Sequence, residues 1–123
     1  MTAVAFPKLA QLRTPAALRG RVLVAEDGED NQRLLRAILT RAGLVVEGVA
    51  NGALASERAL AAWELGEPFD VVLMDMQMPV LDGYSATQML RQSGYEGPIV
   101  AVTAHAMVDD QDRCLASGCD RFA

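Results

Sequence analysis

Residues 71–79 read Val-Val-Leu-Met-Asp-Met-Gln-Met-Pro, and a turn signal, Leu-Asp-Gly, follows at 81–83. A short unbroken apolar run is typical of a strand that is buried on both faces, at the centre of a parallel sheet. Asp75 then lies where this strand leaves the core. In open α/β sheets, this is the edge at which ligands bind.

Strands and helices alternate on both sides of this stretch. Apolar runs predict strands at 22–25, 44–49, 69–74, 99–102 and, as a short last strand, 119–123. Helical spacing predicts helices at 31–42, 53–65, 84–92 and 107–117. The alternation predicts one parallel α/β sheet with right-handed crossovers and helices on both faces.

The continuity of the apolar runs predicts the order of the strands. The strands that end at Asp27, Asp75 and Thr103 are the most continuous and should be central, whereas Glu47 interrupts the second strand and places it at an edge. This gives a flavodoxin-like, doubly wound, five-stranded sheet of order 2-1-3-4-5. In the first helix, one face is expected to pack on the sheet, and its apolar residues are Leu34, Leu35, Ile38, Leu39 and Ala42.

The composition excludes several classes of function. The chain has 123 residues, the length of one domain, and a formal net charge of −5 with a single lysine, Lys8. Nucleic-acid surfaces need clustered lysines and arginines, so no nucleic-acid contact is expected. We find no apolar run of membrane-spanning length and no secretory signal, and therefore expect a cytoplasmic domain without membrane contact. Cys114 and Cys119 lack zinc-site spacing and are expected to be buried and free.

Polar residues follow the central strands at the same edge of the sheet. Glu26 and Asp27 follow the first strand, Asp75 follows the third, and Thr103 follows the fourth. Carboxylates a few ångströms apart disfavour each other's ionised form, so one of them keeps a proton or a cation lies between them. Oxygen ligands with no clustered His or Cys favour a hard cation, Mg²⁺ before Ca²⁺.

A carboxylate beside Mg²⁺ can attack phosphorus and form an aspartyl-phosphate, and Asp75 is the candidate nucleophile. Such a transfer depends on positioning and on charge neutralisation. The hydroxyl group of Thr103 could bond a phosphoryl oxygen. Ala104 is small and leaves room for the phosphoryl group.

Three stretches together resemble the receiver domain of two-component response regulators: residues 22–27, 75–83 and 102–104. The resemblance implies that Asp75 takes a phosphoryl group from the phosphohistidine of a histidine kinase or histidine phosphotransfer domain. It also implies that Asp27 binds Mg²⁺ directly together with Asp75, that Glu26 binds it through water, and that Gln77 contributes its backbone carbonyl.

The resemblance assigns roles to further residues. Thr103 and Ala104 contact the phosphoryl group, and Phe122 occupies the aromatic switch position. Gln77 and His105 occupy positions that tune the lifetime of the phosphoryl group. The family implies a self-phosphorylating phosphoacceptor with weak autodephosphorylation, not an enzyme that turns over an external substrate.

The resemblance also suggests a domain organisation. Residues 21–123 form the receiver domain and residues 1–20 a linker from an upstream domain. Residues 25–32 look like receivers of hybrid sensor histidine kinases, and residues 17–20 look like the linker after a kinase catalytic domain. A stand-alone response regulator, or one with another output domain, is the alternative.

The chain departs from the family pattern at its end. The family has a lysine about two residues further on, and here no lysine follows Lys8. The last strand is expected to be truncated and the fifth helix missing. We therefore expect Mg²⁺ binding with poor phosphorylation, and possible self-association through the uncovered C-terminal edge.

Two other readings compete with a phosphorylated receiver. A haloacid dehalogenase-type phosphatase needs a second aspartate at the position of Gln77, which argues against that class. A receiver-like interaction module that carries no phosphate is the other alternative, and the intact set of Glu26, Asp27, Asp75 and Thr103 argues against it.

Overall fold

The computed structural model describes residues 19–78, 80–102 and 108–122, with side chains of the last segment described for 112–120. The elements are β1 (Arg21–Ala25), α1 (Glu29–Arg41), β2 (Val45–Val49), α2 (Gly52–Glu64), β3 (Val71–Asp75), α3 (Gly83–Gln92), β4 (Ile99–Val102), α4 (Val108–Ser117) and β5 (Arg121–Phe122). All nine correspond to elements predicted from the sequence, and their ends differ by a few residues.

The strands form one parallel sheet of order β2-β1-β3-β4-β5, which confirms the predicted flavodoxin-like topology. In register, Ala25 of β1 lies opposite Met74 of β3, and Asp75 lies opposite Val102 of β4. The carboxyl ends of the three central strands therefore meet at one edge of the sheet. The strand that carries Glu47 lies at the outer edge, as predicted.

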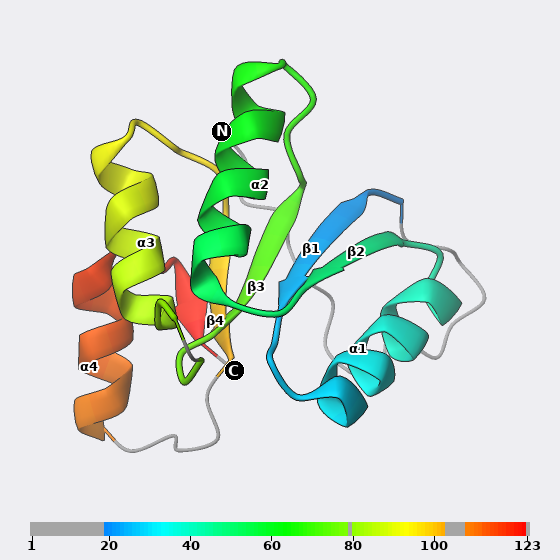
Figure 1. Cartoon of the computed structure of the whole chain (residues 1–123), viewed down its shortest axis with the longest axis horizontal. Helices are drawn as coiled ribbons and strands as arrows, with labels where there is room; N and C mark the ends of the chain where they lie inside the picture. The colour runs from blue at the N-terminus through cyan, green and yellow to red at the C-terminus, as the bar shows by residue number, and fades with distance from the viewer. Residues whose placement is uncertain (1–18, 79, 103–107, 123) are drawn as a thin grey trace.

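Alternate residues of the central strands supply two cores, because successive side chains point to opposite faces of a sheet. On one face, Leu23, Val72 and Met74 pack with α2, α3 and α4. On the other, Val22, Val24, Val71 and Leu73 pack with Leu39 of α1. Figure 1 shows α1 on one side of the sheet and the group formed by α2, α3 and α4 on the other.

The apolar face predicted for α1 is only partly buried. Leu39 and Ala42 are buried, whereas Leu34 is 59% exposed and Ile38 is 37% exposed. Helix α1 packs mainly against β1 and β2, and Leu34 and Ile38 lie on the part of its apolar stripe that these strands leave exposed. Helical spacing identified the stripe correctly but not which part of it reaches the sheet.

The loop from β3 to α3 packs tightly against the end of β3. Asp82, interpreted from the sequence as a turn residue, caps α3 by accepting hydrogen bonds from Ser85, at 2.8 Å from the backbone N–H and 3.2 Å from the hydroxyl. A Cβ at Gly83 would lie 2.2 Å from the backbone oxygen of Asp75. Glycine is therefore required at this position, and its close approach fixes the loop that follows Asp75.

Val80 lies in this loop with φ of +69° and is 83% exposed. A β-branched residue is strained in the left-handed region, which asparagine tolerates better. We expect Val80→Asn to raise the free energy of unfolding by about 1 kcal/mol, measured by urea denaturation. Val45→Asn, at an exposed strand position, is the matched control and should not stabilise the protein. Equal or lower stability of Val80→Asn would contradict the expected relief of strain.

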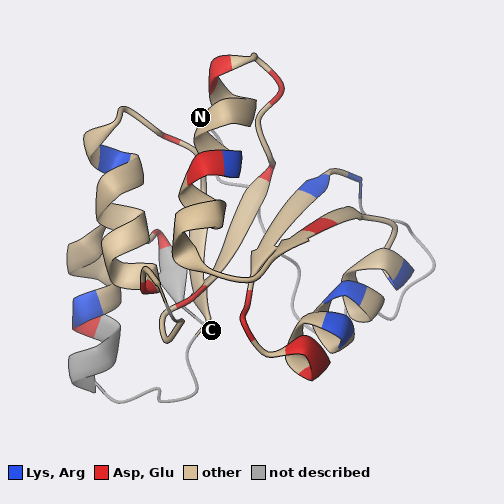
Figure 2. Cartoon of the chain, viewed as in Figure 1, with Lys and Arg blue, Asp and Glu red and all other residues tan. Residues whose placement is uncertain are grey.

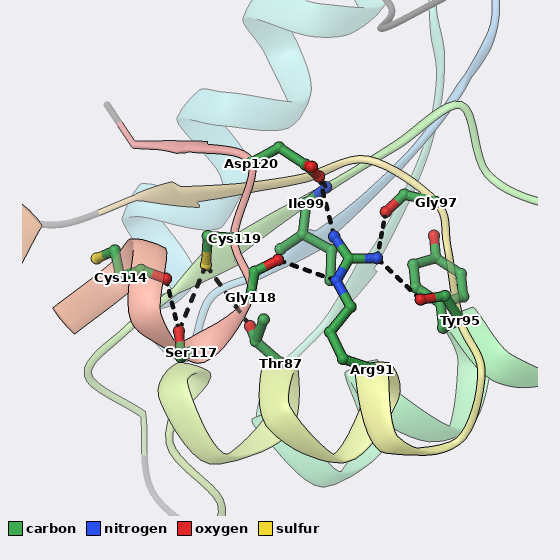
Figure 3. A network of polar contacts seen from close by, with 10 residues as sticks. All are labelled: Thr87, Arg91, Tyr95, Gly97, Ile99, Cys114, Ser117, Gly118, Cys119 and Asp120. Atoms are coloured by element: carbon green, nitrogen blue, oxygen red, sulfur yellow. Dashed lines mark hydrogen bonds and ion pairs between the residues drawn. The ribbon is translucent and has the colours of Figure 1, made fainter. Parts of the chain in front are cut away.

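Arg91 links the end of α3 to two neighbouring turns (Figure 3). Its guanidinium group donates to the carbonyl oxygens of Gly118, Tyr95 and Gly97 at 2.9, 2.9 and 2.8 Å, and to Asp120 Oδ2 at 2.9 Å. Asp120 Oδ2 also accepts a 2.8 Å bond from the backbone N–H of Ile99. This network joins α3, the turn before β4 and the turn before β5.

Cys114 and Cys119 are buried and free, as the sequence predicts. Burial raises the pKa of the Cys119 thiol, which lies 3.8 Å from both the Thr87 and the Ser117 hydroxyl oxygens. Among the described helices, none has the length and apolar character needed to cross a membrane.

Candidate metal centre

Three carboxylates meet at the carboxyl edge of the sheet. Glu26 and Asp27 follow β1, and Asp75 is the last residue of β3. One oxygen from each lies within 4.8 Å of the others. Figure 2 shows the acidic segment that joins β1 to α1 beside the acidic end of β3. The sheet topology brings these residues together because β1 and β3 are neighbouring parallel strands.

Backbone bonds hold Glu26 in place. The residue is buried, with 8% of its surface exposed, and Glu26 Oε2 accepts a 3.3 Å bond from the N–H of Gly28. The backbone N–H of Glu26 donates to Val49 at 3.0 Å, and Gln32 Nε2 donates to the carbonyls of both residues at 3.0 Å. Gln32 therefore fixes the junction of β1 and β2 beneath the cluster.

Asp75 is oriented by the backbone of the loop that follows β3. Its Oδ1 accepts a 3.0 Å bond from the backbone N–H of Gln77, and Asp75 itself is half-buried. The backbone N–H of Met76 donates to Val102 of β4 at 3.2 Å. These bonds fix the position of Asp75 at the carboxyl edge of the sheet, between the acidic pair that follows β1 and the end of β4.

The electrostatics of the cluster favour a bound cation or a retained proton. The pKa of the Glu26 carboxyl is raised above its usual value, first by burial and second by the adjacent Asp75 carboxyl group. Asp27 is exposed and Asp75 is half-buried, so both are open to a ligand. Three oxygen ligands at this spacing, with no His or Cys in the cluster, fit Mg²⁺.

This pKa shift predicts the pH dependence of stability without divalent metal. The folded protein holds the Glu26 proton more tightly than the unfolded chain does. The stability that the protonated Glu26 contributes is therefore fully present below the ordinary glutamate pKa of 4.5, and it is lost as the pH rises through the raised pKa of the folded protein. Glu26→Gln should therefore be more stable than wild type at neutral pH in EDTA, and the difference should vanish at low pH. Urea denaturation across this range measures it, with the exposed Glu96→Gln as control. A difference in unfolding free energy between wild type and Glu26→Gln that stays constant across the pH range would contradict the expectation.

The remaining predicted site residues are placed only in part. Gln77 is exposed beside Asp75. Thr103, Ala104 and His105 lie outside the described residues, directly after the strand that pairs with β3. The backbone of Phe122 lies in β5 opposite Ala101, and its side chain is not among those that the structure describes.

Sequence reasoning missed a groove beside the cluster. We name it the β3–α4 groove; it has a volume of about 380 Å³ and is lined by Asp27, Met76, Gln77, Met78, Asp82, Tyr84 and Arg113. The guanidinium carbon of Arg113 lies 4.0 Å from the centre of the Tyr84 ring. Sequence spacing gives no sign of this contact, because only the packing of α4 on α3 creates it.

Comparison with known proteins supports one family. The model of the response regulator receiver domain matches residues 22–123. The chain is 43% identical over 104 residues to the two-component response regulator ORR41 of Oryza sativa subsp. japonica, with 83% of this chain and 80% of that protein covered. It is 41% identical over 107 residues to the sensor histidine kinase GacS of Pseudomonas protegens, with 83% of this chain but only 11% of the kinase covered.

Solved structures give the same result. The receiver domain of the sensor histidine kinase PA1611 of Pseudomonas aeruginosa, solved with magnesium in its active-site cleft, has a TM-score of 0.75 and 36% identity, with 86% of this chain and 84% of that chain covered. The receiver domain of the Arabidopsis thaliana histidine kinase CKI1, in complex with Mg²⁺ and BeF₃⁻, has a TM-score of 0.71 and 31% identity, with 85% and 79% covered.

The family match covers residues 22–123, which include Glu26, Asp27 and Asp75. This match decides against a haloacid dehalogenase-type phosphatase, the class from which Gln77 already departs. The chain belongs to the family of response regulator receiver domains of two-component systems.

Proposed function

We propose that Asp75 is the phosphoacceptor of this receiver domain, and that it takes the phosphoryl group in a Mg²⁺-dependent reaction. The observation that carries the proposal is the meeting of Glu26, Asp27 and Asp75 within 4.8 Å at the carboxyl edge of the sheet. Asp75 is half-buried at a strand end and is held by one backbone N–H, so its carboxylate is positioned to attack phosphorus.

Each residue has a separate part in this proposal. Asp27, Asp75 and the backbone carbonyl of Gln77 would hold Mg²⁺ directly, and Glu26 would act on it through water. Bound Mg²⁺ would neutralise the negative charge that the phosphoryl group brings to an acidic site. Thr103 and Ala104 contact the phosphoryl group, Phe122 responds to it, and Gln77 and His105 set its lifetime.

The same proposal covers the domain's partners and context. The phosphoryl donor is a histidine kinase or a histidine phosphotransfer domain, and the parent protein is a hybrid sensor histidine kinase, with residues 1–20 as the linker. Resemblance to kinase receivers supports this, although this chain spans only 6% and 11% of two such kinases. The domain acts in the cytoplasm as a phosphoacceptor with weak autodephosphorylation.

The test is labelling of the folded chain with radiolabelled acetyl phosphate. We expect slow but measurable acid-labile labelling that appears with Mg²⁺ and is absent with EDTA. Phosphotransfer from a phosphorylated histidine kinase should label the same protein. A folded chain that binds Mg²⁺ but takes no label from either donor would instead support the unphosphorylated interaction module.

We also propose that copies of the chain self-associate along the edge of the sheet formed by β5. Exposed Leu34 and Ile38 and half-buried Val100 and Val102 leave apolar surface on the α1 side of the sheet. Sedimentation across a range of protein concentrations tests this, and a monomer at every concentration would contradict it.

A further inference from the structure

The β3–α4 groove adjoins the acidic cluster, since Asp27 belongs to both and Met76 and Gln77 of its lining directly follow Asp75. The volume of the groove, about 380 Å³, accommodates a small phosphorylated molecule. The loop that forms one wall is fixed by the close approach of Gly83 to Asp75. A donor that delivers a phosphoryl group to Asp75 therefore has room in this groove for its leaving group.

The carboxylates that line the groove repel an anionic donor, and one residue of the lining carries the opposite charge. Asp27 and Asp82 are carboxylates, and the Asp82 carboxylate accepts hydrogen bonds from Ser85 as the cap of α3. Arg113 is the only cationic residue in the described lining. The ion pairs identified in the described part of the chain involve Arg33, Arg58 and Arg91, and none involves Arg113.

The guanidinium group of Arg113 is oriented by an aromatic ring. Its central carbon lies 4.0 Å from the centre of the Tyr84 ring, in the range of a cation–π interaction. Tyr84 lies in the first turn of α3, and its hydroxyl oxygen lies 4.0 Å from the Cys114 sulfur, which donates to it. A guanidinium group that stacks on a ring keeps its N–H edge available for the paired oxygens of a carboxylate.

We propose that Arg113 binds the leaving carboxylate of a small acyl-phosphate donor in the β3–α4 groove. This inference rests on the proposed phosphoacceptor role of Asp75. In the step, an Asp75 carboxylate oxygen forms a bond to phosphorus while the bond from phosphorus to the acyl oxygen breaks. The carboxylate leaves with the bonding electrons, and no proton transfer is needed. Arg113 stabilises the charge that develops on this leaving group.

The test compares two donors with different leaving groups. Acetyl phosphate releases an anionic carboxylate, whereas phosphoramidate releases ammonia. Arg113→Gln should lower the second-order labelling rate with acetyl phosphate by about tenfold, the effect of one charge-assisted hydrogen bond. The rate with phosphoramidate should stay unchanged or rise. The acetyl phosphate rate of wild type should also fall more steeply with salt than that of the variant.

Matched variants exclude a general charge effect. Arg36→Gln removes the same charge from an exposed site on α1 and should label like wild type with both donors. Arg113→Lys should recover part of the acetyl phosphate rate, because it keeps the charge without the paired N–H edge. Thermal unfolding of each variant checks that the fold is kept.

The outcomes separate this inference from the proposed function. Equal acetyl phosphate rates for wild type and Arg113→Gln would overturn the role of Arg113 alone. Equal losses with both donors would show a structural role and would also overturn it. A folded wild-type protein that takes no label from either donor would overturn the phosphoacceptor role, and the role of Arg113 with it.

Discussion

Asp75→Asn is expected to abolish labelling by acetyl phosphate. The amide nitrogen and oxygen of asparagine lack the nucleophilic charge of the carboxylate, so no aspartyl-phosphate can form. The side chain keeps its size, and its oxygen can still accept the 3.0 Å bond from the N–H of Gln77. The fold should therefore survive while the label falls to the background of incidental reaction. Acid-labile radioactivity, measured over time with Mg²⁺ present, gives the result.

Two controls define the role of Asp75 in this experiment. Asp30→Asn removes a carboxylate from an exposed position in the first turn of α1 and should label like wild type. Asp27→Asn keeps the nucleophile but weakens the metal site, so its labelling should require higher Mg²⁺ concentrations. Label that persists in Asp75→Asn at the wild-type rate would show that another residue is the acceptor.

Arg91→Met should lower the free energy of unfolding by about 2–4 kcal/mol, since several charge-assisted bonds to part-buried acceptors are lost together. Methionine retains much of the apolar stem but leaves three carbonyl groups and Asp120 without the guanidinium donor. Asp120 is 55% exposed at its side chain, so most of the effect should come from the carbonyls. Urea denaturation with EDTA measures the change separately from metal binding.

Comparison variants can contradict this interpretation of the Arg91 network. Arg36→Met, at an exposed position of α1, should change the unfolding free energy by less than about 0.5 kcal/mol. Asp120→Asn should have a smaller effect than Arg91→Met, because an amide oxygen can still accept from Ile99. A cost for Arg91→Met no larger than that for Arg36→Met would mean that water replaces the guanidinium group without loss.

The sheet and its acidic cluster were predictable because both depend on short, local signals. Each central strand is an unbroken apolar run, and Glu47 marks the edge strand. Glu26, Asp27 and Asp75 follow such runs directly, and parallel neighbours bring strand ends together. The pattern therefore gives both the topology and the position of the three carboxylates.

Features that depend on packing between helices were not predictable. The apolar stripe of α1 is visible in the sequence, but the exposure of Leu34 arises from where that helix meets the sheet. Arg91 and Arg113 appear as ordinary charged residues of amphipathic helices. Their partners come from turns and helices that only the tertiary fold places beside them.

The most direct measurement is to locate the phosphoryl group itself. The chain is labelled with acetyl phosphate and Mg²⁺, and borohydride reduction then converts an aspartyl-phosphate to homoserine. Fragmentation mass spectrometry reads the position of the homoserine. We expect homoserine at position 75, only in samples that received both donor and Mg²⁺. Homoserine at Asp27 or another aspartate, with Asp75 unchanged, would contradict the assignment of Asp75 as the phosphoacceptor.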